Sequence, residues 1–294
     1  MTNAYISRFA PSPSGPLHLG SLLAAVAGWL DARAAGGQWL LRIEDIDPPR
    51  EPAGAKDWIL EALDAHGLHW DGEPMLQSSR DAAYRAALAH LANAGMLFRC
   101  TCTRQDLRAH GGVYPGTCRD RGMARLPTGT PHALRVRVPD GDAARIRFED
   151  RLRGSSEFDL AADQGDFIVR RKDGLWAYQL AVVVDDAEQG ITDVVRGVDL
   201  LDSTPRQIHL QRLLGLPTPR YLHLPILVDQ RGDKLSKQAG ATGLELSDPR
   251  ANLARALGWL NLPADPAAAV DAQLDRALAA YRPQDLPLGP IVLS

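Results

Sequence analysis

The first 43 residues follow a strand–turn–helix–strand pattern, which limits the chain to a small set of folds. Residues 5–10 are short, apolar and aromatic, as in a buried strand, and 11–16 read Pro-Ser-Pro-Ser-Gly-Pro, which no regular element tolerates. Apolar residues then recur at helical spacing over 18–35 until Gly36-Gly37, and 38–43 form a second buried-strand pattern. This order predicts a Rossmann-like, doubly wound parallel sheet of the α/β class.

The rest of the chain continues this pattern around a segment of different character. Further helices are expected over 53–65, 80–94 and 204–214, and buried strands over 179–184, 191–195 and 221–228. Thr204 and Gln207 fit a capping box at the start of the third of these helices. Within 98–175 the helical stripes thin out, and the alternation over 134–138 suggests exposed antiparallel strands.

These patterns divide the chain into four predicted parts. They are 1–97, the first half of the α/β domain; 98–175, an inserted α+β subdomain; 176–240, the second half of the α/β domain; and 241–294, a short C-terminal helical segment.

Composition excludes several classes of protein. Apolar residues make up 45% and charged residues 23% of the chain, which is ordinary for a globular protein. No apolar run approaches about 18 residues, and the N-terminus lacks a secretory pattern. Three cysteines are too few for a disulfide scaffold and suit a reducing compartment. We therefore expect a cytoplasmic protein without a membrane span, and nothing in the sequence demands more than a monomer.

Basic residues gather in one window although the formal net charge is −3. Between Arg99 and Arg153 there are twelve arginines and six acidic residues, so the window carries +6 and the remainder −9. A basic module on an acidic body can steer a polyanion such as RNA to one face. The alternative is a general preference for arginine, since only four of the 33 basic residues are lysine.

Two segments suit phosphate chemistry. His18 and Gly20 lie where the first predicted helix begins, and a helix N-terminus presents free N–H groups and partial positive charge to an anion. Lys234 and Lys237 lie in a segment flanked by Gly232 and Gly240, which could close on a triphosphate. Each segment alone could equally be a solvated loop.

Together, in this order, the two segments resemble the "HIGH" and "KMSKS" signatures of class I aminoacyl-tRNA synthetases. The first stands here as His18-Leu19-Gly20-Ser21 and the second as Lys234-Leu235-Ser236-Lys237-Gln238. The segments 8–15 and 41–47 resemble the glutamyl and glutaminyl branch in particular, and the resemblance extends over residues 5 to about 260. It departs from the signatures at Leu19, Ser21, Leu235 and Gln238.

The resemblance implies roles for individual residues. His18 and Lys237 would be catalytic. Glutamate would be bound by Arg8, Ala10, Ser12, Glu44, Tyr178 and Arg196, and ATP, with Mg²⁺, by Pro13, Ser14, Gly15, His18, Gly20, Lys234, Ser236 and Lys237. The chemistry is suitable, because arginine makes charge-assisted bonds to carboxylates and a glutamate accepts from an ammonium group. Which arginine meets which carboxylate stays open.

All three cysteines fall within 19 residues, at Cys100, Cys102 and Cys118. Three thiolates and a fourth ligand suit tetrahedral structural zinc, which would stabilise an insert with little core of its own. His110 is the chemically more usual fourth ligand, whereas the family resemblance points to Tyr114. Three free thiols are the alternative.

The family resemblance, together with the length of the chain, also distinguishes between possible substrates. Only about 55 residues follow Gln238, which we take as too few for the anticodon-binding domain of a conventional glutamyl-tRNA synthetase. The chain therefore resembles the glutamyl-Q tRNA(Asp) synthetases, which join glutamate to the queuosine base of tRNA(Asp) after forming glutamyl-adenylate. The alternatives are a truncated glutamyl-tRNA synthetase, a small-molecule nucleotidyltransferase and a catalytically idle RNA-binding paralogue.

Overall fold

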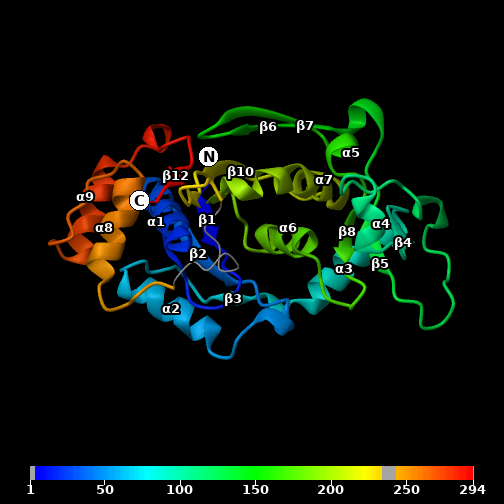
Figure 1. Cartoon of the computed structure of the whole chain (residues 1–294), viewed down its shortest axis with the longest axis horizontal. Helices are drawn as coiled ribbons and strands as arrows, with labels where there is room; N and C mark the ends of the chain where they lie inside the picture. Colours follow the sequence, from blue (N-terminus) through cyan, green and yellow to red (C-terminus); the bar gives the residue numbers. More distant parts are fainter. Residues whose placement is uncertain (1–3, 234–242, 294) are drawn as a thin grey trace.

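A parallel sheet forms the centre of the computed structural model, which describes residues 4–233 and 243–293 (Figure 1). Strand β1 (Ile6–Phe9) pairs in parallel with β2 (Gln38–Ile43), and β2 pairs in parallel with β3 (Met75–Leu76). Between β1 and β2 the chain crosses over through helix α1 (Leu19–Ala34). The strand–turn–helix–strand pattern predicted at the start of the chain is confirmed.

The second half of the chain adds strands on the other side of β1. β9 (Asp193–Gly197) pairs in parallel with β10 (Arg220–Leu224). β1 and β9 lie side by side, because the Thr192 N–H donates to the Ile6 carbonyl and the Ile6 N–H donates to Thr192 Oγ1, each at 2.9 Å. The strands therefore lie in the order β3-β2-β1-β9-β10. Starting from β1, the chain first adds strands on one side of it and later adds strands on the other side, which confirms the predicted doubly wound α/β fold. In such sheets ligands bind where the order reverses, at the carboxyl ends of the strands.

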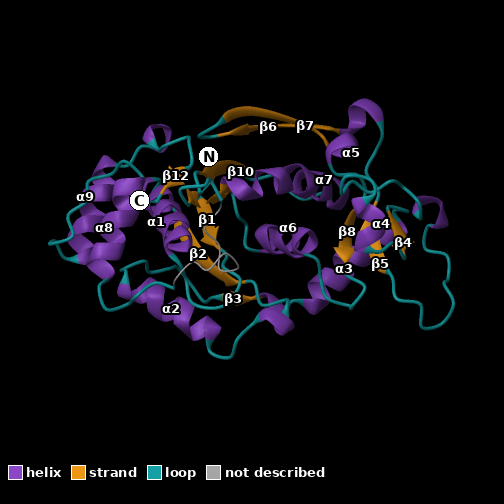
Figure 2. Cartoon of the chain, viewed as in Figure 1, coloured by secondary structure: helices purple, strands orange, loops and turns teal. Residues whose placement is uncertain are grey.

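Helices cover this sheet much as the sequence predicts (Figure 2). α2 (Ala55–Ala65) and α3 (Asp81–Asn93) match the expected helices, and α7 (Thr204–Leu214) precedes β10. Near the C-terminus, α8 (Pro249–Trp259) and α9 (Val270–Ala280) pack on α1. Within the described residues, no helix has the length and apolarity needed to cross a lipid bilayer.

The strand predicted over 179–184 is wrong, because this segment lies within helix α6 (Tyr178–Glu188). Its residues from Gln179 to Val183 are all buried, so the helix shows almost no polar face in this part. A short run of buried residues shows no regular spacing of polar among apolar residues, so its sequence does not distinguish a strand from a helix.

The capping box predicted at Thr204 is also wrong. Thr204 is the first helical residue of α7, and its Oγ1 accepts from the Arg196 guanidinium at 2.8 Å instead of capping the helix. The strand expected over 221–228 is divided in two around Pro225. Its second part, β11 (Leu227–Val228), pairs with β12 (Ile291–Val292) near the C-terminus.

The middle segment contains an antiparallel sheet, as predicted. β4 (Leu97–Cys100), β5 (Ala133–Val136) and β8 (Phe167–Arg170) form it, with β5 at its centre. The expectation that 134–138 is exposed is wrong, because Arg135 is buried with its guanidinium over the Tyr114 ring. The short helices α4 (Arg104–Arg108) and α5 (Leu160–Asp163) belong to the same segment.

A long hairpin connects this segment to the central sheet. β6 (Arg145–Asp150) and β7 (Gly154–Asp159) pair in antiparallel fashion, and Asp150 of β6 pairs with Tyr221 of β10. The predicted division at residues 97, 175 and 240 stays a proposal.

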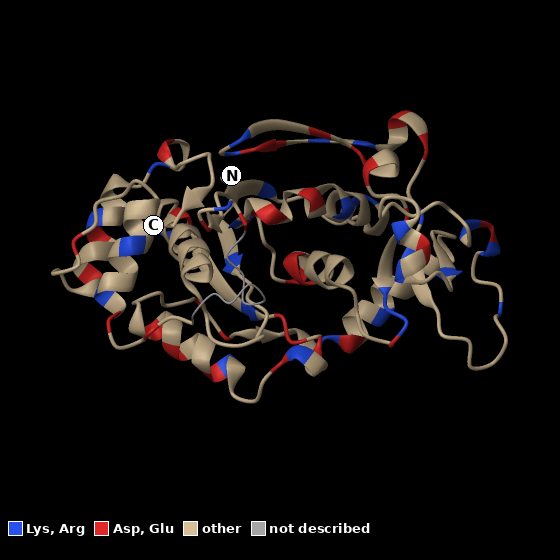
Figure 3. Cartoon of the chain, in the orientation of Figure 1, with Lys and Arg blue, Asp and Glu red and all other residues tan. Residues whose placement is uncertain are grey.

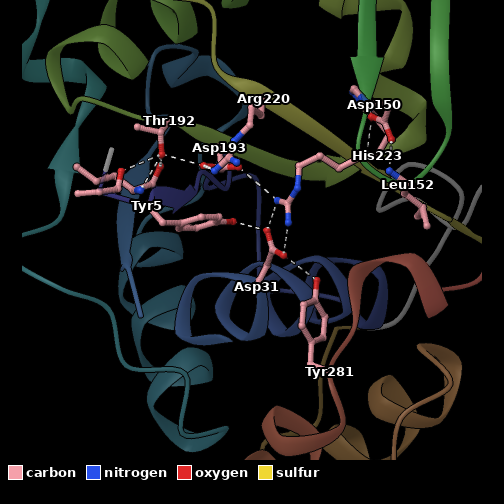
Figure 4. A network of polar contacts seen from close by, with 12 residues as sticks. Tyr5, Asp31, Asp150, Leu152, Thr192, Asp193, Arg220, His223 and Tyr281 are labelled. Atoms are coloured by element: carbon pink, nitrogen blue, oxygen red, sulfur yellow. Dashed lines mark hydrogen bonds and ion pairs between the residues drawn. The ribbon is translucent and has the colours of Figure 1, made fainter. Parts of the chain in front are cut away.

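Buried Asp31 on α1 holds three distant segments together (Figure 4). Its carboxylate accepts from Arg151 in the β6–β7 turn at 2.6 Å and from the Tyr281 hydroxyl, just after α9, at 3.2 Å. The Tyr5 hydroxyl, just before β1, also donates to Asp31. The hairpin and the C-terminal helices are thus fixed to the helix that begins at the predicted phosphate-binding turn.

Candidate active site

A cavity of about 550 Å³ opens at the carboxyl ends of β1, β9 and β10, where the strand order reverses. Most of the residues predicted to bind glutamate or ATP line it together. These are Arg8, Ala10, Ser12, Ser14, His18, Gly20, Glu44, Tyr178 and Arg196. Segments about 190 residues apart in sequence therefore meet at one site.

Two further predicted nucleotide-binding residues, Pro13 and Gly15, are not among the residues that line this cavity. Pro13 and Gly15 are buried within the turn, and Gly15 has φ of 134°, a conformation that favours glycine. Lys234, Ser236 and Lys237 lie outside the described residues. On either side of that range, Leu227 lines the cavity and the Leu244 N–H donates to the Leu17 carbonyl at 2.8 Å.

His18 caps helix α1 at the floor of the cavity. Its Nδ1 accepts from the Ser21 N–H at 3.2 Å, which fixes the ring at the helix N-terminus. Gly20 leaves space for this ring, since a Cβ at that position would lie 3.0 Å from His18 Cε1. The turn thus combines a positioned imidazole with the positive end of a helix dipole.

One wall of the cavity carries paired charges. Arg8 Nε lies 2.9 Å from Asp186 Oδ1, and the buried Arg42 lies 2.8 Å from Asp186 and 3.4 Å from Glu44. Burial opposes the charge of Asp186, but Arg8 and Arg42 outweigh it and hold its pKa below the ordinary value. Burial raises the pKa of Glu44 despite the nearby arginines.

Arg196 faces the same cavity among neutral partners. Its guanidinium donates to Gln207 Oε1 at 2.8 Å, to Thr204 Oγ1 at 2.8 Å and to His223 Nε2 at 3.1 Å. The Tyr178 hydroxyl lies 3.5 Å from Arg196 Nη1.

Sequence reasoning missed the residues behind the two arginines. Arg42 is a charged residue within an otherwise apolar run, and that contrast could have marked it, whereas Asp186 follows an apolar run beside other polar residues. His223 stands in a buried strand pattern, where a lone histidine gives little signal.

A second cavity of about 710 Å³ adjoins the first, and both are lined by Ser12, Ser14, Glu44 and Tyr178. The further lining comes from the loop after β2 and from the chain before α6, and it includes Asp47, Arg50, Glu51, Arg171 and Trp176. Asp47 accepts from Arg171 at 3.1 Å, so this wall bridges the first half of the sheet and the middle segment.

The three cysteines converge beside the antiparallel sheet. The sulfurs of Cys100, Cys102 and Cys118 lie within 4.8 Å of one another. The Tyr114 hydroxyl accepts from the Cys118 N–H at 2.7 Å, whereas exposed His110 is not among the described residues that make up this group. Burial disfavours the Cys118 thiolate, but hydrogen bonds involving Thr101 and Tyr114 outweigh it and lower the pKa of the thiol to about 7.

The arginines of the basic window divide into structural and exposed groups. Arg151 binds Asp31 and Arg135 is buried, whereas Arg147 is exposed and pairs with Glu157 at 2.8 Å on the surface. Basic segments also lie around α4 and β4, where Arg104 and Arg108 are exposed (Figure 3).

Comparisons with known proteins agree with this geometry. A family model described as the catalytic domain of class I tRNA synthetases (E and Q) matches residues 5–252. The glutamyl-Q tRNA(Asp) synthetase of Cupriavidus metallidurans is 57% identical over 85% of this chain and 82% of its own length. That of Pseudomonas syringae pv. tomato is 55% identical over 89% of this chain and 86% of its own length.

A solved structure gives the same result for the fold. The glutamate-tRNA synthetase of Elizabethkingia anophelis has a TM-score of 0.82 at 26% identity, and the match covers 99% of this chain and 68% of that one. The chain therefore belongs to the class I tRNA synthetases of the E and Q group, and within that group to the glutamyl-Q tRNA(Asp) synthetases.

Proposed function

We propose that this chain activates L-glutamate with ATP and transfers the glutamyl group to the queuosine base at the wobble position of tRNA(Asp). The observation that carries the proposal is the cavity in which Arg8, Arg196, Glu44 and Tyr178 converge beside the N-terminus of α1. Two cationic side chains suit the two carboxylates of glutamate, and Glu44 and Tyr178 suit its ammonium group. We also propose that the protein is a monomer located in the cytoplasm.

In the first step, a glutamate carboxylate oxygen attacks the α-phosphorus of ATP and pyrophosphate leaves. His18 and the N–H groups at the start of α1 would stabilise the charge on the phosphates, and Lys237 would add a further positive charge. Mg²⁺ bound with ATP supplies further charge neutralisation at the phosphates. Glu44, Arg8 and Arg196 would hold the amino acid so that its carboxylate oxygen faces the α-phosphorus.

In the second step, a hydroxyl of the queuosine cyclopentenediol attacks the glutamyl carbonyl and AMP leaves. The acceptor must reach the activated carbon from a neighbouring space, and the second cavity adjoins the glutamate pocket along Glu44 and Tyr178. Asp47 and Glu51 provide hydroxyl acceptors there, and Arg50 and Arg171 pair with Asp47 and hold its carboxylate in place.

We also propose that Cys100, Cys102, Cys118 and Tyr114 hold one structural zinc ion. The donor set fits, because three sulfurs and a phenol oxygen gather around one point. The zinc would connect the end of β4 to the 114–118 loop and has no part in either chemical step.

The test is glutamate transfer to three purified RNAs with radiolabelled glutamate and ATP. We expect labelling of queuosine-bearing tRNA(Asp), and none of tRNA(Asp) with guanosine at that position or of tRNA(Glu). Charging of tRNA(Glu) would instead identify a truncated glutamyl-tRNA synthetase. Absence of both transfer and ATP–pyrophosphate exchange would identify an idle paralogue.

A further inference from the structure

A buried chain of hydrogen bonds runs behind Arg196. Arg196 Nε, on β9, donates to His223 Nε2, on β10, at 3.1 Å, and His223 Nδ1 lies 2.6 Å from Asp150 Oδ2, on β6. Asp150 is fixed in turn, because its carboxylate accepts from the backbone N–H groups of Leu152, Arg153 and His223 at about 3.0 Å (Figure 4). Both Asp150 and His223 are completely or almost completely buried.

The chemistry of these partners fixes the state of the imidazole. A guanidinium N–H only donates, so Nε2 must accept and carries no proton. A carboxylate only accepts, so the proton lies on Nδ1 and points to Asp150. The charges around His223 are Asp150 on β6, Arg196 on β9 and Arg153 in the β6–β7 turn. The imidazole is therefore neutral, in the Nδ1–H tautomer.

This arrangement leaves the charge of Arg196 available. Within the described residues, no carboxylate oxygen lies within 4.0 Å of its guanidinium, whereas Arg8 in the same cavity is paired with Asp186. A carboxylate in the place of His223 would neutralise Arg196. The neutral imidazole keeps the negative charge of Asp150 one side chain further away, while still holding the plane of the guanidinium.

We propose that His223, locked in one tautomer by Asp150, is a positioning residue for Arg196, aiming its remaining N–H groups at a substrate carboxylate without cancelling their charge. This proposal rests on the proposed function, since it assigns that carboxylate to glutamate. His223 touches neither substrate and acts only through Arg196.

Two substitutions of His223 separate the roles of its two ring nitrogens, the acceptor Nε2 and the donor Nδ1. In H223Q, the glutamine oxygen can take the place of Nε2 and accept from Arg196. In H223N, the amide can take the place of Nδ1 and donate to Asp150, but no acceptor reaches Arg196. H209Q is the control, because His209 is another buried histidine, on α7, that bonds the Arg137 carbonyl at 2.8 Å.

The readouts are glutamate affinity by calorimetry and the KM for glutamate and for ATP in the transfer assay. We expect H223N to weaken glutamate binding about tenfold or more while the KM for ATP stays within about threefold. H223Q and H209Q should stay within about threefold for both substrates. Equal glutamate affinity in H223N and wild type would overturn the proposal, as would equal weakening in H223Q and H223N.

A second measurement needs no variant to be active. The ¹⁵N shifts of His223 at pH 7, assigned by their loss in H223Q, should report a neutral ring protonated at Nδ1. An Nε2–H tautomer or a cation would refute the positioning role. If wild type does not bind glutamate at all, the proposed function fails, while the tautomer result still tests the hydrogen-bond chain by itself.

Discussion

Arg8 and Arg196 show how two identical side chains acquire different roles in one cavity. Arg8 is held by a buried carboxylate and Arg196 by neutral acceptors. Both arginines could be predicted from the sequence through its resemblance to the glutamyl and glutaminyl branch, which assigns them to glutamate. The sequence could not predict their partners Asp186 and His223, because these come from elements that approach only in the folded chain.

Replacing Asp186 should disturb the ion pairs that Arg8 and Arg42 form beside the cavity. In D186N, Arg8 and Arg42 lose the carboxylate they share, and Arg8 loses the one ion pair it forms within the described residues, while Arg42 keeps Glu44 at 3.4 Å. We expect the KM for glutamate to rise by about tenfold or more and the thermal midpoint to fall. Titration of transfer rate against glutamate concentration measures the first effect. An unchanged KM would mean that Asp186 does not orient Arg8.

Lys237 gives a separate prediction about the phosphate side of the cavity. K237A should lower the rate of glutamyl-adenylate formation by about 100-fold or more, because charge developing in the transition state loses its partner. Glutamate affinity should change little. ATP–pyrophosphate exchange measures the rate, and K56A, which removes an exposed lysine on α2, is the matched control. Unchanged exchange in K237A would remove this lysine from the mechanism.

At the scale of elements, the first sheet strands and most helices could be predicted, and α6 could not. β1, α1 and β2 show the apolar spacing typical of strands and of a helix, and proline and glycine residues separate them. Their ends can therefore be predicted from the sequence. The residues of α6 from Gln179 to Val183 are all buried, so this part of the helix shows no solvent face in the sequence. The position of β5 at the centre of its sheet follows from pairing with two strands that no local pattern specifies.

The cysteine group gives a prediction for the antiparallel sheet. Purified protein should contain about one zinc per chain, and C118S should lose the metal and lower the thermal midpoint, because a short insert loses its cross-link. H110A should keep the metal, since His110 does not belong to the group in the described chain. Y114F tests the fourth ligand and should bind zinc more weakly. Metal analysis near zero in fresh, reduced wild-type protein would contradict the site.

At the scale of the whole molecule, the reversal of strand order beside β1 decides where the chemistry is. It brings the N-terminal turn, the ends of β9 and β10 and the loop after β2 to one edge of the sheet. The sequence could predict this class of fold because the alternation of elements is regular. The way in which β6 joins the sheet next to β10 could not be predicted, because only a single residue pair connects them.

Buried histidines should make the stability of the molecule depend on pH. Burial lowers the pKa of His66, His209 and His223 below 6.5, so below that pH the unfolded chain binds protons that the folded chain refuses. Stability should therefore fall as pH decreases from about 7 to 5.5. The lowered pKa values of Asp150 and Asp186 act only near and below 3.8.

Urea denaturation across this pH range measures the effect, and H209Q should flatten it. Stability that is constant or increases on acidification would contradict this prediction.

The position of glutamate on the RNA tests the central claim most directly. After reaction with ATP and glutamate, queuosine-bearing tRNA(Asp) is digested to nucleosides under mild acid and analysed by mass spectrometry. We predict that the added glutamyl mass is on the queuosine nucleoside and that the 3′-terminal adenosine is unmodified. Glutamate on the terminal adenosine, with unmodified queuosine, would contradict the account.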